Sequence, residues 1–89
     1  MVYVGVMCLF IETQRIKHGR GYPLIKNPPY ISYGARIGSA SIIMPGVRIG
    51  REAMVAAGSL VTKDCDPFWV YMGRPAKKIR PVPDDEILR

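Results

Sequence analysis

The sequence predicts an all-β fold, a parallel β-helix, and a six-residue period between Ile31 and Asp66 carries this prediction. Cut at this period, the segment reads ISYGAR, IGSASI, IMPGVR, IGREAM, VAAGSL and VTKDCD. The first position of each hexad is branched and aliphatic, and the fifth is small or short, through six unbroken repeats. An amphipathic helix repeats near 3.6 residues and an ordinary strand near 2, so neither element gives this pattern. Fixed hexads that stack as the sides of a coil do give it.

The first and fifth positions have different predicted roles. The first residue is expected to fill the interior, and these residues are Ile31, Ile37, Ile43, Ile49, Val55 and Val61. The fifth residue is expected to let the chain pass a narrow corner, and these residues are Ala35, Ser41, Val47, Ala53, Ser59 and Cys65. Burial of the first positions would therefore test the repeat register.

The repeat also begins upstream and is then interrupted. VGVMCL starts at Val4 with a small fifth residue, and FIETQR follows with Phe10 in the first position. From Phe10 to Ile31 is 21 residues, which is not a multiple of six, so an insertion must leave the coil. The intervening IKHGRGYPLIKNPPY is rich in glycine and proline, as loops are. Insertions in repeat proteins form loops on one face, often the binding face.

The chain is expected to form one domain with four parts. These are first hexads at 4–15, an excluded loop at 16–30, six regular hexads at 31–66, and an end strand with a tail at 67–89. In the last part PFWVYM is expected to be a short strand, with Trp69 and Tyr71 covering the end of the coil. A turn is expected at 73–75, AKKIRPV is expected to leave the body, and a helix is expected to start with Asp84 as its N-cap.

Size and charge indicate partners. A chain of 89 residues buries a modest core, and solenoid ends stay exposed, so partner subunits are expected. The net charge of +6 favours an anionic partner: nucleic acid, a membrane or a phosphorylated cofactor. Only the stretch from Arg74 to Arg80 clusters basic residues, without interleaved aromatic residues. This composition favours a phosphate pocket over a nucleic-acid surface.

The cysteines and the N-terminus exclude several classes of protein. Cys8 and Cys65 form no CxxC pair and no metal spacing, and packing explains both. The apolar run from Met1 to Ile11 has no preceding basic residue and is too short to span a bilayer. We therefore expect no metal, no membrane association and a cytoplasmic location.

Two pieces, PGVRIGREAMVAAGSLVTKD and MGRPAKKI, resemble the C-terminal part of the hexapeptide-repeat acyltransferases, among them sugar O- and N-acetyltransferases. The resemblance implies a left-handed parallel β-helix, an exception to the usual right-handed crossover. It also implies a homotrimer, with acetyl-CoA in the groove between neighbouring subunits. Acetyl would pass to a hydroxyl or amine of a sugar, serine or antibiotic. The chain is short for this family, either a fragment or a minimal member.

The resemblance also implies cofactor-binding residues. The amide of Ser39 should face the thioester, and the backbone at Ala57 should hold the pantetheine arm. Thr62 and Lys63 match a TKD segment near the phosphate and adenine end. Two residues of MGRPAKK match positions that meet the adenine or the 3′-phosphate, namely Arg74 and Lys77. For each of these residues, corner geometry or a solvated charge is the alternative explanation.

His18 and Glu12 are the candidate catalytic residues. His18 is the only histidine and lies in the excluded loop, where many family members carry a catalytic base. Imidazole titrates near neutral pH and would take the acceptor's proton. Glu12 would orient His18 or act as the base itself. A surface position is the alternative for both, and some family members use no protein base.

Three other functions compete with acetyl transfer. A trimeric scaffold without an acceptor pocket shares the fold and differs by not binding acetyl-CoA. A γ-class carbonic anhydrase needs three histidine ligands for zinc, which one histidine per chain does not supply. Nucleic-acid binding through the basic tail would appear in a gel shift at low salt.

Overall fold

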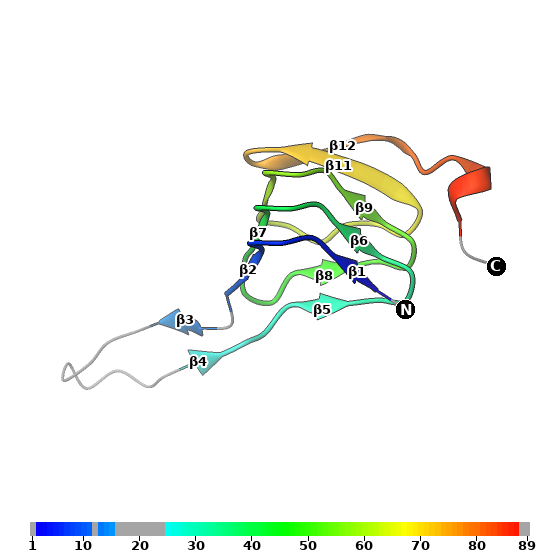
Figure 1. Ribbon diagram of the computed structural model, residues 1–89. Helices are drawn as coiled ribbons and strands as arrows, with labels where there is room; N and C mark the ends of the chain where they lie inside the picture. Colours follow the sequence, from blue (N-terminus) through cyan, green and yellow to red (C-terminus); the bar gives the residue numbers. More distant parts are fainter. Residues whose placement is uncertain (1, 12, 16–24, 88–89) are drawn as a thin grey trace.

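The computed structural model describes residues 2–11, 13–15 and 25–87. The described chain is built from short strands and one 3-10 helix, η1, at Asp84–Glu86. In chain order the strands are β1 Tyr3–Val4, β2 Leu9–Phe10, β3 Thr13–Arg15, β4 Ile25–Lys26, β5 Tyr30–Ile31, β6 Arg36–Ile37, β7 Ile42–Ile43, β8 Arg48–Ile49, β9 Met54–Val55, β10 Leu60–Val61, β11 Trp69–Gly73 and β12 Ala76–Pro81 (Figure 1). The all-β class is therefore confirmed.

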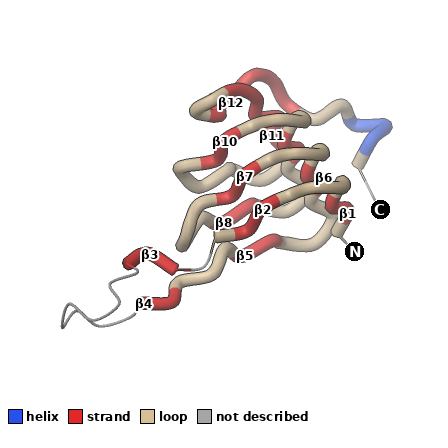
Figure 2. The backbone as a smooth tube through the Cα atoms, turned by 60° about the vertical axis from the view of Figure 1, so that its left-hand side comes forward, coloured by secondary structure: helices blue, strands red, loops and turns tan. Residues whose placement is uncertain are grey.

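The strands pair in parallel between successive turns of the chain. Arg36 on β6 pairs with Met54 on β9, and Ile42 on β7 pairs with Leu60 on β10, each 18 residues later. Three hexads therefore make one turn, and each turn lies on the next with its strands in register (Figure 2). The sheets β1–β6–β9–β11, β2–β7–β10 and β5–β8 form the sides.

The pairing register also locates the excursion, which is the inserted segment that leaves the coil. Tyr3 on β1 pairs with Arg36, 33 residues later, so the first turn contains 15 residues more than the 18-residue step between β6 and β9. At the base of this excursion, β3 pairs with β4 in antiparallel orientation, away from the stacked turns (Figure 1). The strand β4 lies in the predicted loop at 16–30, whereas β3 lies in the residues that were assigned to the first hexads at 4–15.

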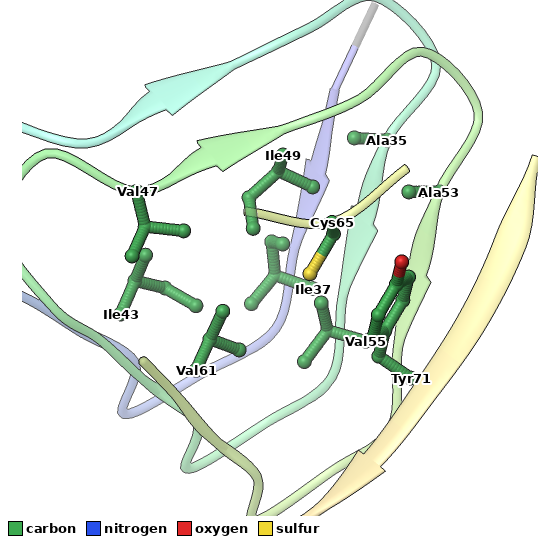
Figure 3. Packing of buried hydrophobic residues seen from close by; sticks show 10 residues of the cluster. All are labelled: Ala35, Ile37, Ile43, Val47, Ile49, Ala53, Val55, Val61, Cys65 and Tyr71. Atoms are coloured by element: carbon green, nitrogen blue, oxygen red, sulfur yellow. The ribbon is translucent and has the colours of Figure 1, made fainter. Parts of the chain in front are cut away.

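The core consists of the residues at the first and fifth hexad positions. Ile37, Ile43 and Ile49 are fully buried, and Val55 and Val61 are 1% exposed. These side chains point toward one another inside the coil (Figure 3). The small fifth residues are buried as well, with Cys65 at 4%. The predicted inward and corner positions are confirmed, except that Ile31 is only half-buried where it packs against this core.

Burial falls toward the first turn. Val4 and Phe10 occupy first positions but remain 41% and 40% exposed. In the described chain they are covered by strands on one side only, β1 by β6 and β2 by β7. The burial of a first-position residue therefore depends on a turn at each side of it.

The C-terminal hairpin covers the other end of the coil. Tyr71 on β11 is 7% exposed, and its hydroxyl accepts a hydrogen bond from the Asp66 amide at 2.8 Å. Trp69 packs against the core, and Lys78 lies over its ring and donates to Asp66 at 2.8 Å. The predicted covering role of Trp69 and Tyr71 is confirmed.

Two expectations for the C-terminal part were wrong. The AKKIRPV segment does not leave the body, because β12 pairs antiparallel with β11 through the turn at Gly73. The expected helix is a single 3-10 turn that follows Pro83 without a side-chain cap. Its hydrogen bond runs from the Glu86 amide to the Pro83 carbonyl, so the Asp84 side chain is not the cap.

Truncation of one inward side chain tests the repeat register. Ile49→Ala should lower the free energy of unfolding by about 2 to 5 kcal/mol, because it removes buried methyl groups and leaves a cavity. Ile49→Asp should prevent folding, since it buries an unpaired charge. Urea unfolding measures both variants. Ile79→Ala is the matched control, because Ile79 is 51% exposed, and its cost should stay within about 0.5 kcal/mol. Equal losses for the two alanine variants would contradict the register.

Candidate functional site

The candidate site lies at the corner where the strands β6 and β9 end. Gly38 follows β6 and Ala56 follows β9, so two chain turns stack there. The Gly38 amide donates to the Val55 carbonyl at 2.8 Å, and the Gly58 amide donates to the Ser39 carbonyl at 2.9 Å. A Cβ on Gly38 would lie 2.7 Å from the Ala57 Cα atom. This corner therefore requires glycine, because two backbones approach closely.

An open hollow of 260 Å³ runs along this corner. Its lining is almost entirely apolar, with Arg36 as the one charged member; the lining residues are Tyr3, Arg36, Ile37, Gly38, Met54, Val55, Ala56 and Ala57. The hollow therefore suits a slender chain with little charge.

Two predicted cofactor-binding residues, Ser39 and Ala57, belong to this corner. Ala57 lines the hollow and is exposed, and Ser39 lies one residue past Gly38 and is half-buried. In the described part of the chain, neither amide N–H donates to a protein acceptor. Both N–H groups are thus available to a carbonyl oxygen of a ligand.

The C-terminal hairpin brings Arg74 to the same corner. The Gly73 amide donates to the Ser59 hydroxyl at 3.3 Å, and Ser59 follows the turn that carries Ala57. Arg74 is exposed in the hairpin turn, and the Arg74–Pro75 peptide bond is cis. Lys77 lies opposite Met72 in the hairpin and is exposed. Two basic side chains therefore begin near the end of the hollow.

Thr62 and Lys63 lie at a different corner. They follow β10, and both are exposed. The strand β10 lies on the side β2–β7–β10, whereas Ser39 and Ala57 follow strands of the side β1–β6–β9. Within one chain the structure does not bring these two groups of residues together.

The catalytic candidates Glu12 and His18 lie outside the described residues. The nearest described elements are β3 and β4, which pair at the base of the excursion. Their catalytic roles stay predictions.

A second hollow, of 390 Å³, is more polar. It is lined by Ser32, Arg48, Gly50, Arg51, Asp64, Cys65, Asp66 and Pro67. Burial and two neighbouring aspartates raise the pKa of the Cys65 thiol to about 12, so it is not a nucleophile at neutral pH. The predicted packing role of Cys65 is confirmed. Cys8 is half-buried and packs against the core, and its Sγ lies 3.2 Å from the Gly38 carbonyl.

Sequence reasoning missed three residues that line the first hollow. Arg36 and Met54 each occupy the sixth hexad position, and Tyr3 directly precedes the first-position residue Val4. A residue next to an inward one points outward in a strand. The signal was therefore present, since residues at this position pair across neighbouring turns as Tyr3, Arg36 and Met54.

The described residues hold no group of three or more His, Cys, Asp or Glu side chains arranged to bind a metal ion. They also contain no helix with the length and apolar character needed to cross a membrane.

Several curated proteins with similar sequences are named as acetyltransferases. The chain is 50% identical over 44 residues to a chloramphenicol acetyltransferase from Klebsiella aerogenes, which covers 49% of this chain and 21% of that protein. It is 43% identical over 60 residues to a 2,3,4,5-tetrahydropyridine-2,6-dicarboxylate N-acetyltransferase from Ligilactobacillus salivarius, covering 67% and 26%. It is 42% identical over 55 residues to the bifunctional protein GlmU from Thermotoga maritima, covering 62% and 12%. The matched segments thus span only 12 to 26% of the length of these relatives. No protein-family model matches it.

Solved structures give the same result for the fold. A galactoside acetyltransferase in complex with coenzyme A superposes with a TM-score of 0.71 at 33% identity, over 96% of this chain and 47% of that one. A hexapeptide-repeat acetyltransferase from Vibrio cholerae, complexed with acetyl coenzyme A, gives 0.69 at 26% identity, over 93% and 48%. These findings confirm the predicted resemblance: over about half the length of those structures, the chain has the sequence motifs and the fold of the hexapeptide-repeat acetyltransferases.

Proposed function

We propose that the chain is part of an acetyl-CoA-dependent acyltransferase, which moves acetyl to a hydroxyl or amine of a small acceptor such as a sugar or an antibiotic. The observation that carries this proposal is the apolar hollow with unpaired amides at Ser39 and Ala57. Relatives named for chloramphenicol and tetrahydropyridine dicarboxylate acetylation support it. So do the similar structures solved with coenzyme A or its acetyl ester.

The hollow matches the pantetheine arm of coenzyme A. This arm is slender and mostly apolar, and its amide carbonyls need donors once they leave water. The free N–H of Ala57 meets that need in a hollow lined by Gly38, Ala56 and other apolar groups. Backbone donors on packed turns are held rigidly, so little order is lost on binding.

The thioester would lie beside Ser39. Acyl transfer from a thioester develops negative charge on the carbonyl oxygen, and a fixed N–H donor stabilises that charge. The Ser39 amide is fixed because the Ser39 carbonyl accepts from Gly58 and the Ala40 amide donates to Val6, both at 2.9 Å. Turns on both sides therefore hold this peptide segment.

The phosphates would lie toward the hairpin. Coenzyme A carries a pyrophosphate and a 3′-phosphate, and charge-assisted hydrogen bonds to cations bind them well. Arg74 and Lys77 are exposed basic residues on the hairpin whose Gly73 bonds to Ser59 beside the hollow. The net charge of +6 favours the same ligand.

The proposed assembly is a homotrimer of closed, left-handed coils, with coenzyme A between neighbouring subunits. The support is that Thr62 and Lys63 lie at a different corner from Ser39 and Ala57. A groove between two copies would combine one corner from each, which a single chain does not do. The cytoplasmic location stays a prediction. So does the division of the chain into four parts at 4–15, 16–30, 31–66 and 67–89.

Ligand binding and turnover together test the function. Calorimetry should detect binding of coenzyme A to the protein at millimolar ligand or below. Free-thiol release should follow when acetyl-CoA is mixed with a panel of amino sugars, sugar alcohols, aminoglycosides and chloramphenicol. Absence of coenzyme A binding would favour the scaffold function instead.

Lys77→Ala tests the phosphate contact. It should weaken coenzyme A binding severalfold and reduce its salt dependence, because one charge-assisted contact is lost. Dephospho-coenzyme A should show a smaller difference between wild type and variant. Arg80→Ala is the control, since Arg80 is an exposed cation of the same strand that pairs with Val70, farther from the Gly73 turn than Lys77 is. A similar loss in Arg80→Ala would indicate a general charge effect only.

His18→Ala tests the proposed base. Turnover should fall by about 10² to 10⁴, while coenzyme A affinity stays nearly constant, because the base acts on the acceptor. The wild-type pH–rate profile should show a limb near the usual pKa of about 6.5, and the variant should lose it. Unchanged turnover would point to Glu12, tested by Glu12→Gln, or to proton transfer by the substrate.

Sedimentation tests the assembly. At micromolar concentration the protein should have a mass near three chains, because the stacked turns leave apolar side chains such as Leu9 exposed at 57%. A folded monomer at this concentration would contradict a site shared between subunits.

A further inference from the structure

Arg36 is the charged residue of the apolar hollow. It lies on β6 between Tyr3 on β1 and Met54 on β9, and all three residues line the hollow. The side chain is half-buried. Its Nε and Nη2 atoms are buried and have no hydrogen-bond partner among the described residues.

The other two arginines on the regular hexads are in a different environment. Arg48 is exposed and lies over the Tyr30 ring, 4.9 Å from its centre. Arg51 is exposed and lies over the Tyr33 ring at 5.0 Å. Their charged groups remain hydrated while the side chains stack on aromatic rings. Among the described residues no aromatic ring lies under the Arg36 guanidinium in this way, although Tyr3 is its neighbour across the strands.

Two buried guanidinium nitrogens without acceptors are unfavourable. Burying donors of a charged group without acceptors costs more than one ordinary hydrogen bond contributes. The neighbouring lining residues, Met54, Gly38 and Ala57, offer no carboxylate. Glu52, the fully buried carboxylate of the described chain, lies against Gly34 and does not line the hollow. A molecule that enters the hollow can supply the acceptor that compensates this cost.

We infer that Arg36 binds a carboxylate of the substrate, next to the thioester. The planar guanidinium pairs with a carboxylate through two parallel hydrogen bonds. Arg36 is two residues before Gly38 and three before Ser39, whose amide is proposed to face the thioester. This inference rests on the proposed function for the position of the thioester.

The carboxylate has two possible sources. It is carried by the acyl group, as in a dicarboxylic acyl-CoA, or by the acceptor, as in a sugar acid. The phosphates of coenzyme A are a less suitable partner, because Arg74 and Lys77 lie toward the hairpin end of the corner. In both cases the substrate is anionic, and Arg36 determines the preference for it over an analogue without the carboxylate.

The experiment compares wild type with Arg36→Met and with Arg48→Met. Methionine keeps the linear side chain and removes every donor, and Arg48→Met is the matched change outside the hollow. Calorimetry measures the affinities for acetyl-CoA and succinyl-CoA. Thiol release compares the turnover rates with galacturonate and with galactose as acceptor. Thermal unfolding measures how far free glutarate raises the unfolding temperature. Arg36→Lys, which keeps the charge without the planar fork, should show intermediate preference.

In wild type, either succinyl-CoA should bind about tenfold more tightly than acetyl-CoA, or galacturonate should be used about tenfold better than galactose. The first result identifies the acyl group as the source, and the second identifies the acceptor. Arg36→Met should lose the preference, whereas Arg48→Met should keep it. Without ligand, Arg36→Met should unfold at the same temperature as wild type or higher, because it removes unpaired buried donors.

Equal preferences in wild type and Arg36→Met would overturn the inference. So would a lower unfolding temperature of Arg36→Met without ligand, combined with loss of the assembly, because a carboxylate of another subunit would then be the partner. If wild type binds no coenzyme A ester but glutarate protects wild type and not Arg36→Met, the proposed function fails and the carboxylate site stands. If glutarate protects neither and no ester binds, both fail.

Discussion

The structure depends on one packing constraint: a branched side chain must fill the interior at every sixth residue, beside a corner narrow enough for a small one. Ile37, Val55 and Tyr71 occupy the interior on one side because β6, β9 and β11 pair in register. A shift by one residue would bring Arg36 or Met54 inward, since neighbouring strand residues point to opposite faces. The backbone ladder and the core therefore fix the same register.

This constraint separates the scaffold from the site. The first and fifth positions are occupied by packing, so ligand contacts are restricted to the outward sixth positions, the corner amides and the segments that leave the coil. The hollow follows this division: Arg36 and Met54 are sixth-position residues, and Ala57 is a corner residue. A resemblance to a family in the hexads is therefore strong evidence for the fold and weak evidence for the substrate.

The sequence predicted the coil, the core and the covering end because they repeat. Six hexads agree on the inward residue, and the 21-residue gap between Phe10 and Ile31 shows an insertion. The antiparallel return of β12 was not predictable in this way, because it occurs once and no repeat marks it. The 3-10 turn after Pro83 is too short for capping signals to distinguish it from a helix.

The candidate site was predictable only where a motif fixes the backbone. Ser39 and Ala57 were expected from the resemblance to the hexapeptide-repeat acyltransferases, and the structure places both at one corner. Thr62 and Lys63 lie away from that corner because successive hexads lie on different sides of the coil. A motif in the linear sequence does not show which side each hexad occupies. The exposure of Arg36 depends on Tyr3 and Met54, one turn away on either side, so burial of its nitrogens appears only in the folded chain.

The hairpin shows how the same strand serves both packing and the site. Lys78 is held by Asp66 at 2.8 Å and by the Trp69 ring at 4.2 Å, which fixes β12 against the coil. The hydrogen bond to Asp66 raises the pKa of Lys78, so it stays charged in this contact. Because side chains alternate along a strand, Lys77 must then point to the opposite face. Lys78 is thus the residue of the basic cluster that anchors the strand, and Lys77, on the other face, is the one proposed to contact the ligand.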